Sequence, residues 1–144
     1  FEMRAKLPAE KGVWPAFWLI GVDKSKWSAE LDIMEFYGFP DSYMIHWHIW
    51  DAATHNQREG GGEQVFVEPG ALSARYNDFG ASIEEERTTV YLNRKPVWSM
   101  QTPEEFKQPF YILANLAMGG GWPILAKGPQ FMHIAHIRAY ALKA

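Results

Sequence analysis

The chain has 144 residues, a formal net charge of −3 and no cysteine. This length predicts a single domain over residues 1–144 with a sizeable core. The balance of 14 basic and 17 acidic residues gives no reason to expect binding to nucleic acid or to a membrane, and no apolar run is long enough to cross a bilayer. Seven Trp, six Tyr and nine Phe residues suit both a core and stacking on sugar rings.

Apolar and polar residues alternate along the chain, in short runs separated by Gly and Pro turns, which predicts strands. Thr102–Lys107 is predicted as one helical turn with Thr102 as its cap. Segment 51–62 is polar, ends in three glycines and is predicted to be a flexible loop. Pro15 predicts an edge position or an irregularity for its strand. The expected fold is an all-β sandwich or jelly roll, with strands at 1–7, 13–20, 28–36, 43–50, 64–68, 76–83, 87–93, 110–118 and 131–142.

Three carboxylates lie in the predicted strand 28–36, at Glu30, Asp32 and Glu35. Side chains two residues apart share a face of a strand, so Glu30 and Asp32 point the same way. Strict alternation would send Glu35 to the opposite face. One extra residue in a β-bulge near Ile33–Met34 would return it, and we predict that bulge. The alternative is a chance cluster of solvated acids.

With the bulge, Glu30 and Glu35 are expected to approach to about 5–5.5 Å, the separation found in retaining glycosidases. In that mechanism one carboxylate attacks the sugar and the other transfers a proton. Three close carboxylates cannot all ionise freely, so their pKa values should be pushed apart. We predict that the pKa of Glu35 is raised and that this residue stays protonated near neutral pH.

Strand 43–50 has one apolar face and one face that carries His46 and His48. If this strand pairs with the acidic one, both imidazoles lie in the same cleft; a purely structural role is the alternative. A metal site formed by His46, His48 and His55 would lack a third ligand in fixed structure. We therefore predict neither a metal nor a cofactor.

Several aromatic residues are candidates for contact with a sugar. Trp18 and Trp27 are assigned to sugar stacking, against core packing, and Trp122 to the rim of the cleft because it follows three glycines. Asn115 is a polar residue in an otherwise apolar strand face. We assign it to hydrogen bonding with substrate, against satisfying a neighbouring strand. Two further tryptophans are assigned to the core, Trp14 and Trp47.

Four segments in this order resemble successive parts of glycoside hydrolase family 16: KGVWPAFWLIG, AELDIMEFYG, YILANLAMGGGWP and MHIAHIRAY. The spacing of the carboxylates is similar to the bulged subgroup of laminarinases, agarases and carrageenases. The resemblance implies a concanavalin-like β-jelly-roll of two curved antiparallel sheets. It implies a retaining endo-β-glycanase acting by double displacement on a β-1,3-glucan or a marine galactan. By position, Glu30 would be the nucleophile, Glu35 the acid/base, and Asp32 would tune Glu30.

The chain departs from this family at three places. Strands that usually precede Phe1 are missing, which implies a natural minimal version, an excerpt, or a homodimer or strand swap that completes the sheets. Ala135 stands where many members have an Asp that binds calcium, so no calcium is expected there. The turn Asn93-Arg94 stands where Asp-Gly is customary.

The resemblance also implies a secreted, extracellular or periplasmic protein. Two other functions share the same expected cleft. One is a non-catalytic carbohydrate-binding jelly roll, which the missing strands favour and the three carboxylates disfavour. The other is a transglycosylase, in which an acceptor sugar replaces water at the same intermediate.

Overall fold

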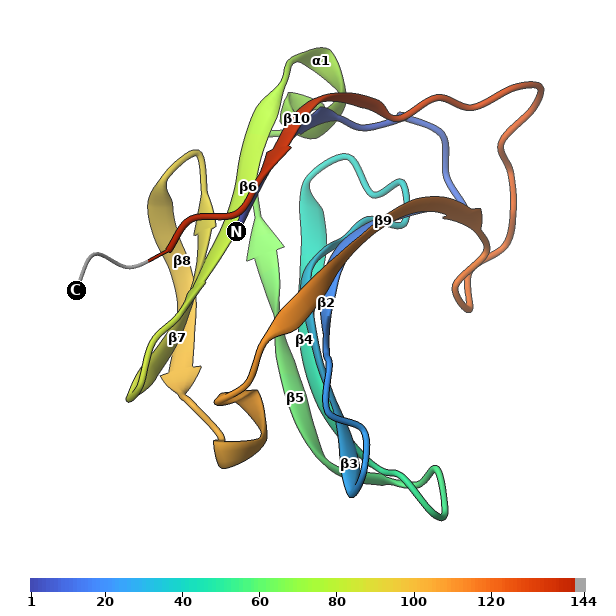
Figure 1. Cartoon of the computed structure of the whole chain (residues 1–144). Helices are drawn as coiled ribbons and strands as arrows, with labels where there is room; N and C mark the ends of the chain where they lie inside the picture. The colour runs from blue at the N-terminus through green and yellow to red at the C-terminus, as the bar shows by residue number, and fades with distance from the viewer. Residues whose placement is uncertain (142–144) are drawn as a thin grey trace.

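The computed structural model describes residues 1–141 as two five-stranded antiparallel sheets packed face to face (Figure 1). The first sheet has the strand order β10-β1-β6-β7-β8, and the second has the order β5-β4-β3-β2-β9. This arrangement confirms the predicted all-β sandwich. The strands are β1 Glu2–Lys6, β2 Val13–Gly21, β3 Trp27–Glu35, β4 Ser42–Asp51, β5 Gln57–Phe66, β6 Asn77–Ile83, β7 Arg87–Leu92, β8 Lys95–Gln101, β9 Phe110–Met118 and β10 His133–Arg138.

The core lies between the two sheets and takes every second residue of the inner strands. Phe17 of β2 and Leu31 of β3 are fully buried from one side, and Met3 and Phe79 from the other. The rings of Tyr43 and Phe79 meet edge to face across the core, with centroids 5.7 Å apart. The alternation that predicted the strands is therefore the alternation between this core and the outer faces.

The predicted β-bulge is present in β3. Asp32 pairs with His46 of β4 and Glu35 pairs with Met44, so three steps along β3 match two along β4. On the other side, Trp18 of β2 pairs with Asp32 and Phe17 pairs with Met34, which leaves Ile33 as the extra residue. Ile33 and Met34 are both fully buried. The bulge therefore turns Glu35 to the face that carries Glu30 and Asp32.

The prediction of a flexible loop over 51–62 is wrong for its second half. β5 begins at Gln57 and includes the three glycines, which pair with β4 opposite His48, Trp47 and His46. A Cβ atom at Gly60 would stand 2.8 Å from the carbonyl oxygen of Trp47. The glycines thus permit a close approach of two backbones instead of marking a loop.

Other boundaries also differ from the prediction. Pro15 does not mark an edge, because β2 lies between β3 and β9. The other possibility, an irregularity, is present two residues later, where the pairing of β2 with β3 shifts between Phe17 and Trp18. The predicted helical turn is a short 3₁₀ helix, η1 (Glu104–Phe106), and Thr102 donates its hydroxyl to the Glu84 carbonyl instead of capping it. Two further elements, β8 and the helix α1 (Ala71–Ala74), were not predicted from the sequence.

The last strand is shorter than predicted, since β10 ends at Arg138 and position 142 lies outside the described residues. Among residues 1–141, the structure contains no helix with the length and hydropathy of a membrane span.

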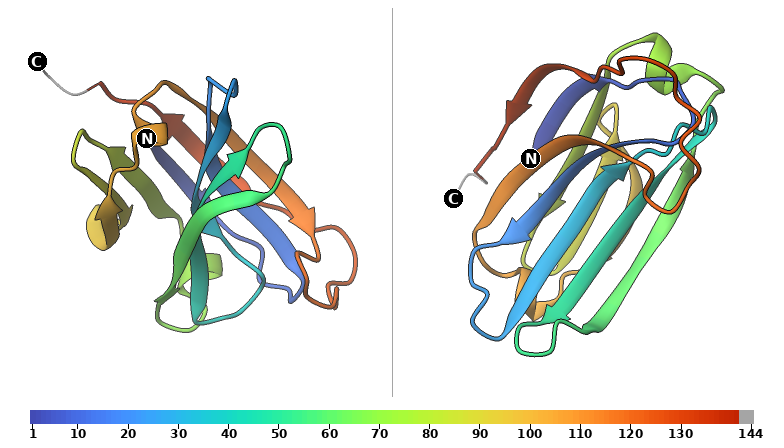
Figure 2. Two further views of the ribbon diagram at one scale, coloured as in Figure 1. Left: turned by 90° about the horizontal axis from the view of Figure 1, so that it is seen from below. Right: turned by 90° about the vertical axis from the view of Figure 1, so that its right-hand side faces the viewer.

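Each sheet has one edge on the same side of the sandwich, formed by β9 and β10 (Figure 2, right). Ile134 and Ile137 pair with Ala5 and Met3, which face the core, yet each isoleucine is 39% exposed. The core-facing residues of β9 are likewise only partly buried. Within residues 1–141, the space between these two edges is therefore an open apolar side of the core.

Replacing Phe79 with Ala should lower the free energy of unfolding by about 3–5 kcal/mol, because it removes a fully buried ring and leaves a cavity. Phe66→Ala is the matched control, since Phe66 is 71% exposed, and it should change stability by less than about 0.5 kcal/mol. Urea unfolding monitored by Trp fluorescence measures both. Equal losses in the two variants would contradict the assigned core.

Candidate active site

The three carboxylates lie together on the outer face of the second sheet, which we call the acidic face. Glu30 pairs with His48 and Asp32 with His46 on β4, so the two imidazoles share this face. One oxygen of Asp32 lies within 4.8 Å of an oxygen of Glu30, and Asp32 also lies within that distance of Glu35. The structure thus brings together the predicted trio, and the burial of Asp32 and Glu35 differs from the alternative of a cluster of solvated acids.

Glu35 is held by three side chains. The indole of Trp14 and the hydroxyl of Tyr37 donate to its Oε1 at 2.9 and 3.0 Å, and His46 Nδ1 lies 2.5 Å from its Oε2. Burial alone would raise the pKa of Glu35, but these three hydrogen bonds outweigh it and lower the pKa below its usual value. The prediction of a raised pKa at Glu35 is therefore wrong for the protein without substrate.

The raised pKa belongs to Asp32. Burial raises it to about 6, against a lowering by His48 and with a further raise from the charges of Glu30 and Glu35. His48 Nε2 lies 3.5 Å from the Asp32 carboxylate, and its Nδ1 contacts the side-chain oxygen of Gln57 at 3.0 Å. The contact with Asp32 raises the pKa of His48 in return. Asp32 and His48 thus form a half-buried pair beside the other two acids.

Glu30 has an aromatic donor of its own, because the indole of Trp50 donates to its Oε2 at 2.9 Å. The Trp50 ring also stacks on His48, with centroids 5.0 Å apart. Trp50 lies two residues from His48 along β4, so strand alternation places it on the same face. Trp14 had been assigned to the core, and its bond to Glu35 corrects that assignment.

Trp18 and Asn115 also lie on the acidic face, from β2 and β9. Trp18 stands opposite Asp32, and its indole donates to the Asn115 side-chain oxygen at 2.8 Å. Asn115 is exposed and anchors the ring from the neighbouring strand. Trp47, by contrast, packs against the core, as predicted.

Trp27 lies on the other face of β3. It shares the side of Ala29 and Leu31, packs against the core, and carries the guanidinium of Arg58 4.4 Å from its ring centroid. Because odd-numbered positions before the bulge face inward, this residue points away from the three acids. The assignment of Trp27 to sugar stacking is therefore dropped.

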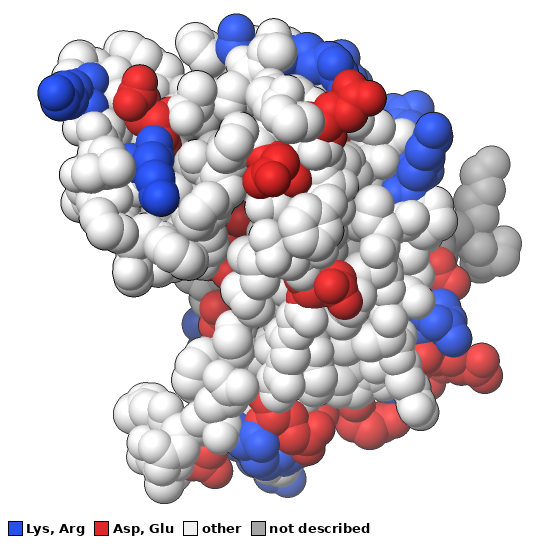
Figure 3. Space-filling view, turned by 180° about the vertical axis from the view of Figure 1, so that it is seen from behind, with Lys and Arg blue, Asp and Glu red and all other residues white. Residues whose placement is uncertain are grey.

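Trp122 stands at the end of the site beside Glu35. It meets Phe39 edge to face at 4.8 Å, and it lines a recess of about 480 Å³ that also includes His46 and Tyr37. Gly120 makes this possible: with φ of 60°, it brings the chain so close that a Cβ would stand 2.6 Å from the Tyr37 ring. In the space-filling view the outline of the molecule is hollowed between two lobes, with acidic atoms inside (Figure 3).

Three groups of side chains within residues 1–141 have the spacing of a metal site: Glu30/Asp32/His48, Asp32/Glu35/His46 and Glu2/Asp78/His136. Calcium prefers six to eight oxygen ligands, and each group offers two carboxylates and one imidazole. In the third group, Arg94 and Arg4 already pair with Glu2 and Asp78. Ala135 offers no side-chain ligand. These residues do not fit the calcium site of the resembled family.

The raised pKa of Asp32 predicts that the stability of the folded chain depends on pH. The folded chain binds a proton at Asp32 more tightly than the unfolded chain, so stability falls as pH rises through the window from about 4 to 6. Between pH 4 and pH 6 the free energy of unfolding of wild type should fall by on the order of 2 kcal/mol relative to that of the Asp32→Asn variant. Urea unfolding of both proteins at pH 4 and 6, below the raised pKa of His48, measures the difference. A difference that stays constant with pH would contradict the assignment.

Comparisons with known proteins identify the family of the chain. The model of glycosyl hydrolases family 16 matches residues 1–130. The chain is 36% identical to the endo-1,3-1,4-beta-glycanase ExsH of Rhizobium meliloti, over all of this chain but 30% of that protein. It is 29% identical to the glucan endo-1,3-beta-glucosidase A1 of Niallia circulans, over 96% of this chain and 24% of the relative.

Among solved structures, the catalytic domain of an endo-1,3-beta-glucanase (laminarinase) from Thermotoga petrophila matches with a TM-score of 0.74 and 25% identity. That match covers 92% of this chain and 59% of the other. The chain therefore spans less than a third of the two curated relatives and more than half of the solved domain. With the family model matched over residues 1–130, the chain belongs to glycosyl hydrolases family 16.

Proposed function

We propose that residues 1–144 act as one catalytic domain of a retaining endo-β-glycanase. The proposed substrate is a β-linked polysaccharide, a β-1,3-glucan or a marine galactan. The single observation that carries the proposal is that Glu30 and Glu35 share one face with Asp32 between them, each held by its own indole donor. The relatives named as endo-1,3-1,4-beta-glycanase and glucan endo-1,3-beta-glucosidase support a glucan.

In the proposed reaction, the carboxylate of Glu30 attacks the anomeric carbon of the bound sugar. The bond from that carbon to the glycosidic oxygen breaks, and Glu35 gives its proton to the departing oxygen. Glu35 then removes a proton from water, whose oxygen attacks the same carbon and releases Glu30. Two inversions leave the configuration of the sugar unchanged.

Glu35 must hold a proton when substrate is bound, although its three hydrogen bonds lower its pKa in the free protein. Burial is the largest single influence on this group and acts in the opposite direction. A saccharide that fills the site excludes water and increases that influence, which favours the protonated acid. We infer that substrate binding itself prepares Glu35 as the general acid, with His46 at 2.5 Å as its proton partner.

Asp32 has a separate proposed role. With a pKa of about 6, it carries a proton in mildly acidic solution and can then donate a hydrogen bond to the carboxylate of Glu30. Such a bond would orient Glu30 and stabilise it as a leaving group in the second step. His48, held by Gln57, sets the charge on Asp32 from the other side.

The remaining residues of the acidic face are proposed to bind the saccharide. Trp18 offers a ring that Asn115 fixes in place, and such a ring can stack on a pyranose face. His46 and His48 would contact the sugar at the reacting bond. Trp122 would hold a neighbouring sugar in the recess beside Glu35.

Glu30→Gln and Glu35→Gln should each lower kcat for soluble β-1,3-glucan by at least about a thousandfold, because each removes a group that reacts in the transition state. Glu86→Gln is the control, since Glu86 is exposed and lies in the turn between β6 and β7 of the first sheet, whereas the acidic face belongs to the second sheet. Release of reducing ends measures the rate, and NMR of the first product gives its anomeric configuration.

Near-wild-type activity in either catalytic variant would contradict the proposal. Binding of glucan by a wild-type chain that releases no reducing ends would instead indicate a carbohydrate-binding module. If the protein is instead given a short β-1,3-glucan oligosaccharide, products longer than that oligosaccharide would indicate a transglycosylase.

We also propose that the protein works outside the cytoplasm, in a secreted or periplasmic location.

We further propose that two copies associate along the open side between β9 and β10. The two edges carry unpaired backbone groups beside exposed apolar side chains within residues 1–141.

Light scattering should then give a mass close to twice 16.5 kDa. Ile137→Lys places a charge on this side and should halve that mass without unfolding the chain. A wild-type mass of one chain at all concentrations would contradict the association.

A further inference from the structure

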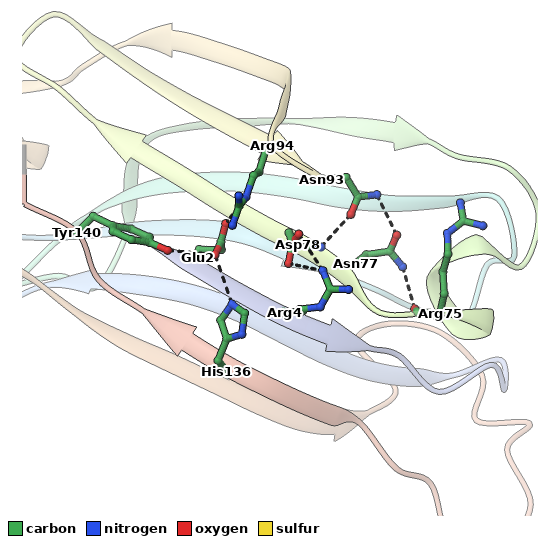
Figure 4. A network of polar contacts seen from close by, with 9 residues as sticks. All are labelled: Glu2, Arg4, Arg75, Asn77, Asp78, Asn93, Arg94, His136 and Tyr140. Atoms are coloured by element: carbon green, nitrogen blue, oxygen red, sulfur yellow. Dashed lines mark hydrogen bonds and ion pairs between the residues drawn. The ribbon is translucent and has the colours of Figure 1, made fainter.

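A second recess lies on the outer face of the first sheet, across the sandwich from the acidic face. It measures about 510 Å³, a size typical of small-ligand sites. We call it the outer recess, and Figure 4 shows part of its lining. The side chains that matter for the argument are those of Glu2, Ser82, Tyr91, Arg94 and Tyr140, with Gly80 between them. None of them takes part in the proposed reaction.

The outer recess exists because Gly80 has no side chain. Glu2, Gly80 and Tyr91 stand in one row across β1, β6 and β7. Two strand spacings, about 10 Å, separate the backbones of Glu2 and Tyr91. The missing side chain leaves an opening between a carboxylate and an aromatic ring, wide enough for one saccharide ring.

Two tyrosines supply the aromatic surface. Tyr140 is 61% exposed, and its hydroxyl donates to Glu2 at 3.2 Å. The Tyr91 hydroxyl lies 3.3 Å from the Ser82 hydroxyl. Each ring thus offers an apolar face with a polar edge, which matches a pyranose with its apolar face and ring of hydroxyl groups.

Glu2 is buried but loosely bound. It is 8% exposed, and its contacts with Arg94, His136 and Tyr140 measure 3.3, 3.4 and 3.2 Å. Charge-assisted hydrogen bonds are usually about 2.7–2.9 Å. The carboxylate can therefore accept a shorter bond from a ligand hydroxyl without losing a strong partner.

Arg94 reaches the outer recess from an unusual turn. Asn93 and Arg94 have φ of 51° and 63°, a region that favours glycine. Asn93 holds the turn in place through the Asp78 amide at 2.9 Å and the Asn77 side chain at 3.0 Å. A glycine at 94 would relieve the backbone, but the strained turn keeps a guanidinium at the recess, where it contacts Glu2 (Figure 4).

We propose that the outer recess is a second glycan-binding site, which holds one sugar of a neutral β-glucan chain away from the acidic face. The choice of a β-glucan rests on the proposed function, whereas the choice of a saccharide rests on the recess. Arg4 and Arg94, paired with Asp78 and Glu2, disfavour a cation at the same place. A second site on the opposite side of the sandwich would keep the protein on an insoluble polymer between cleavages.

The test measures binding to insoluble β-1,3-glucan by depletion from solution, with the Glu35→Gln chain as background so that the polymer stays intact. Tyr140→Ala and Arg94→Gly should each weaken binding at least fivefold. Arg94→Gly should at the same time leave the urea midpoint unchanged or raise it, because it removes a strained residue. Tyr76→Ala is the matched control, since Tyr76 is 41% exposed and outside the outer recess; it should bind as the background does.

In the catalytically intact chain, Tyr140→Ala should leave hydrolysis of short soluble oligosaccharides within twofold of wild type and slow the release of sugar from the insoluble polymer. Unchanged binding in both recess variants, or no binding by the background protein, would overturn the second site. A chain that binds through the outer recess but hydrolyses nothing would contradict the proposed function alone.

Discussion

One extra residue in β3 determines the chemistry of the acidic face. Without Ile33 inserted into the pairing with β2 and β4, Glu35 would point into the core, where a carboxylate has no hydrogen-bonding partner and no water. With the bulge, the side chains of Ile33 and Met34 are buried in the core and that of Glu35 is not directed there. The two hydrophobic neighbours thus fix the register that brings the third acid to the outer face.

Once on the same face, the carboxylates differ through their partners. Glu35 accepts from an indole and a phenol and contacts an imidazole, so its negative form is stabilised. Asp32 is more deeply buried and has one distant imidazole, so its neutral form is favoured. Groups with the same chemistry therefore differ in their affinity for a proton before any substrate arrives.

Strand alternation was sufficient to find most of the strands, the two faces of β3 and the bulge, because all of these follow from a period of two residues. It did not find β8 or the first half of β5. Alternation did not give the pKa of Glu35, because the three partners come from β2, from the second residue after β3 and from β4, and only the folded chain brings them together. Trp14 was misassigned for the same reason: an indole on an outer face of a strand is not marked by sequence as a donor or as a core ring.

Local composition was least informative where glycine was involved. The residues of β5 opposite His48, Trp47 and His46 are all glycine, which indicated a loop. Trp27 was misassigned for a different reason. The alternation that directs the acids outward directs Trp27 inward, but its assignment to sugar stacking rested on the aromatic ring alone.

The glycines of β5 also set the orientation of the imidazoles. A Cβ at Gly62 would stand 2.5 Å from a ring carbon of His46, and one at Gly60 would collide with the Gln57 amide that holds His48. Side chains at these two positions would push the imidazoles away from Glu35 and Asp32. The glycines of β5, a stretch whose composition is typical of a flexible loop, therefore leave the space in which His46 and His48 can contact Glu35 and Asp32.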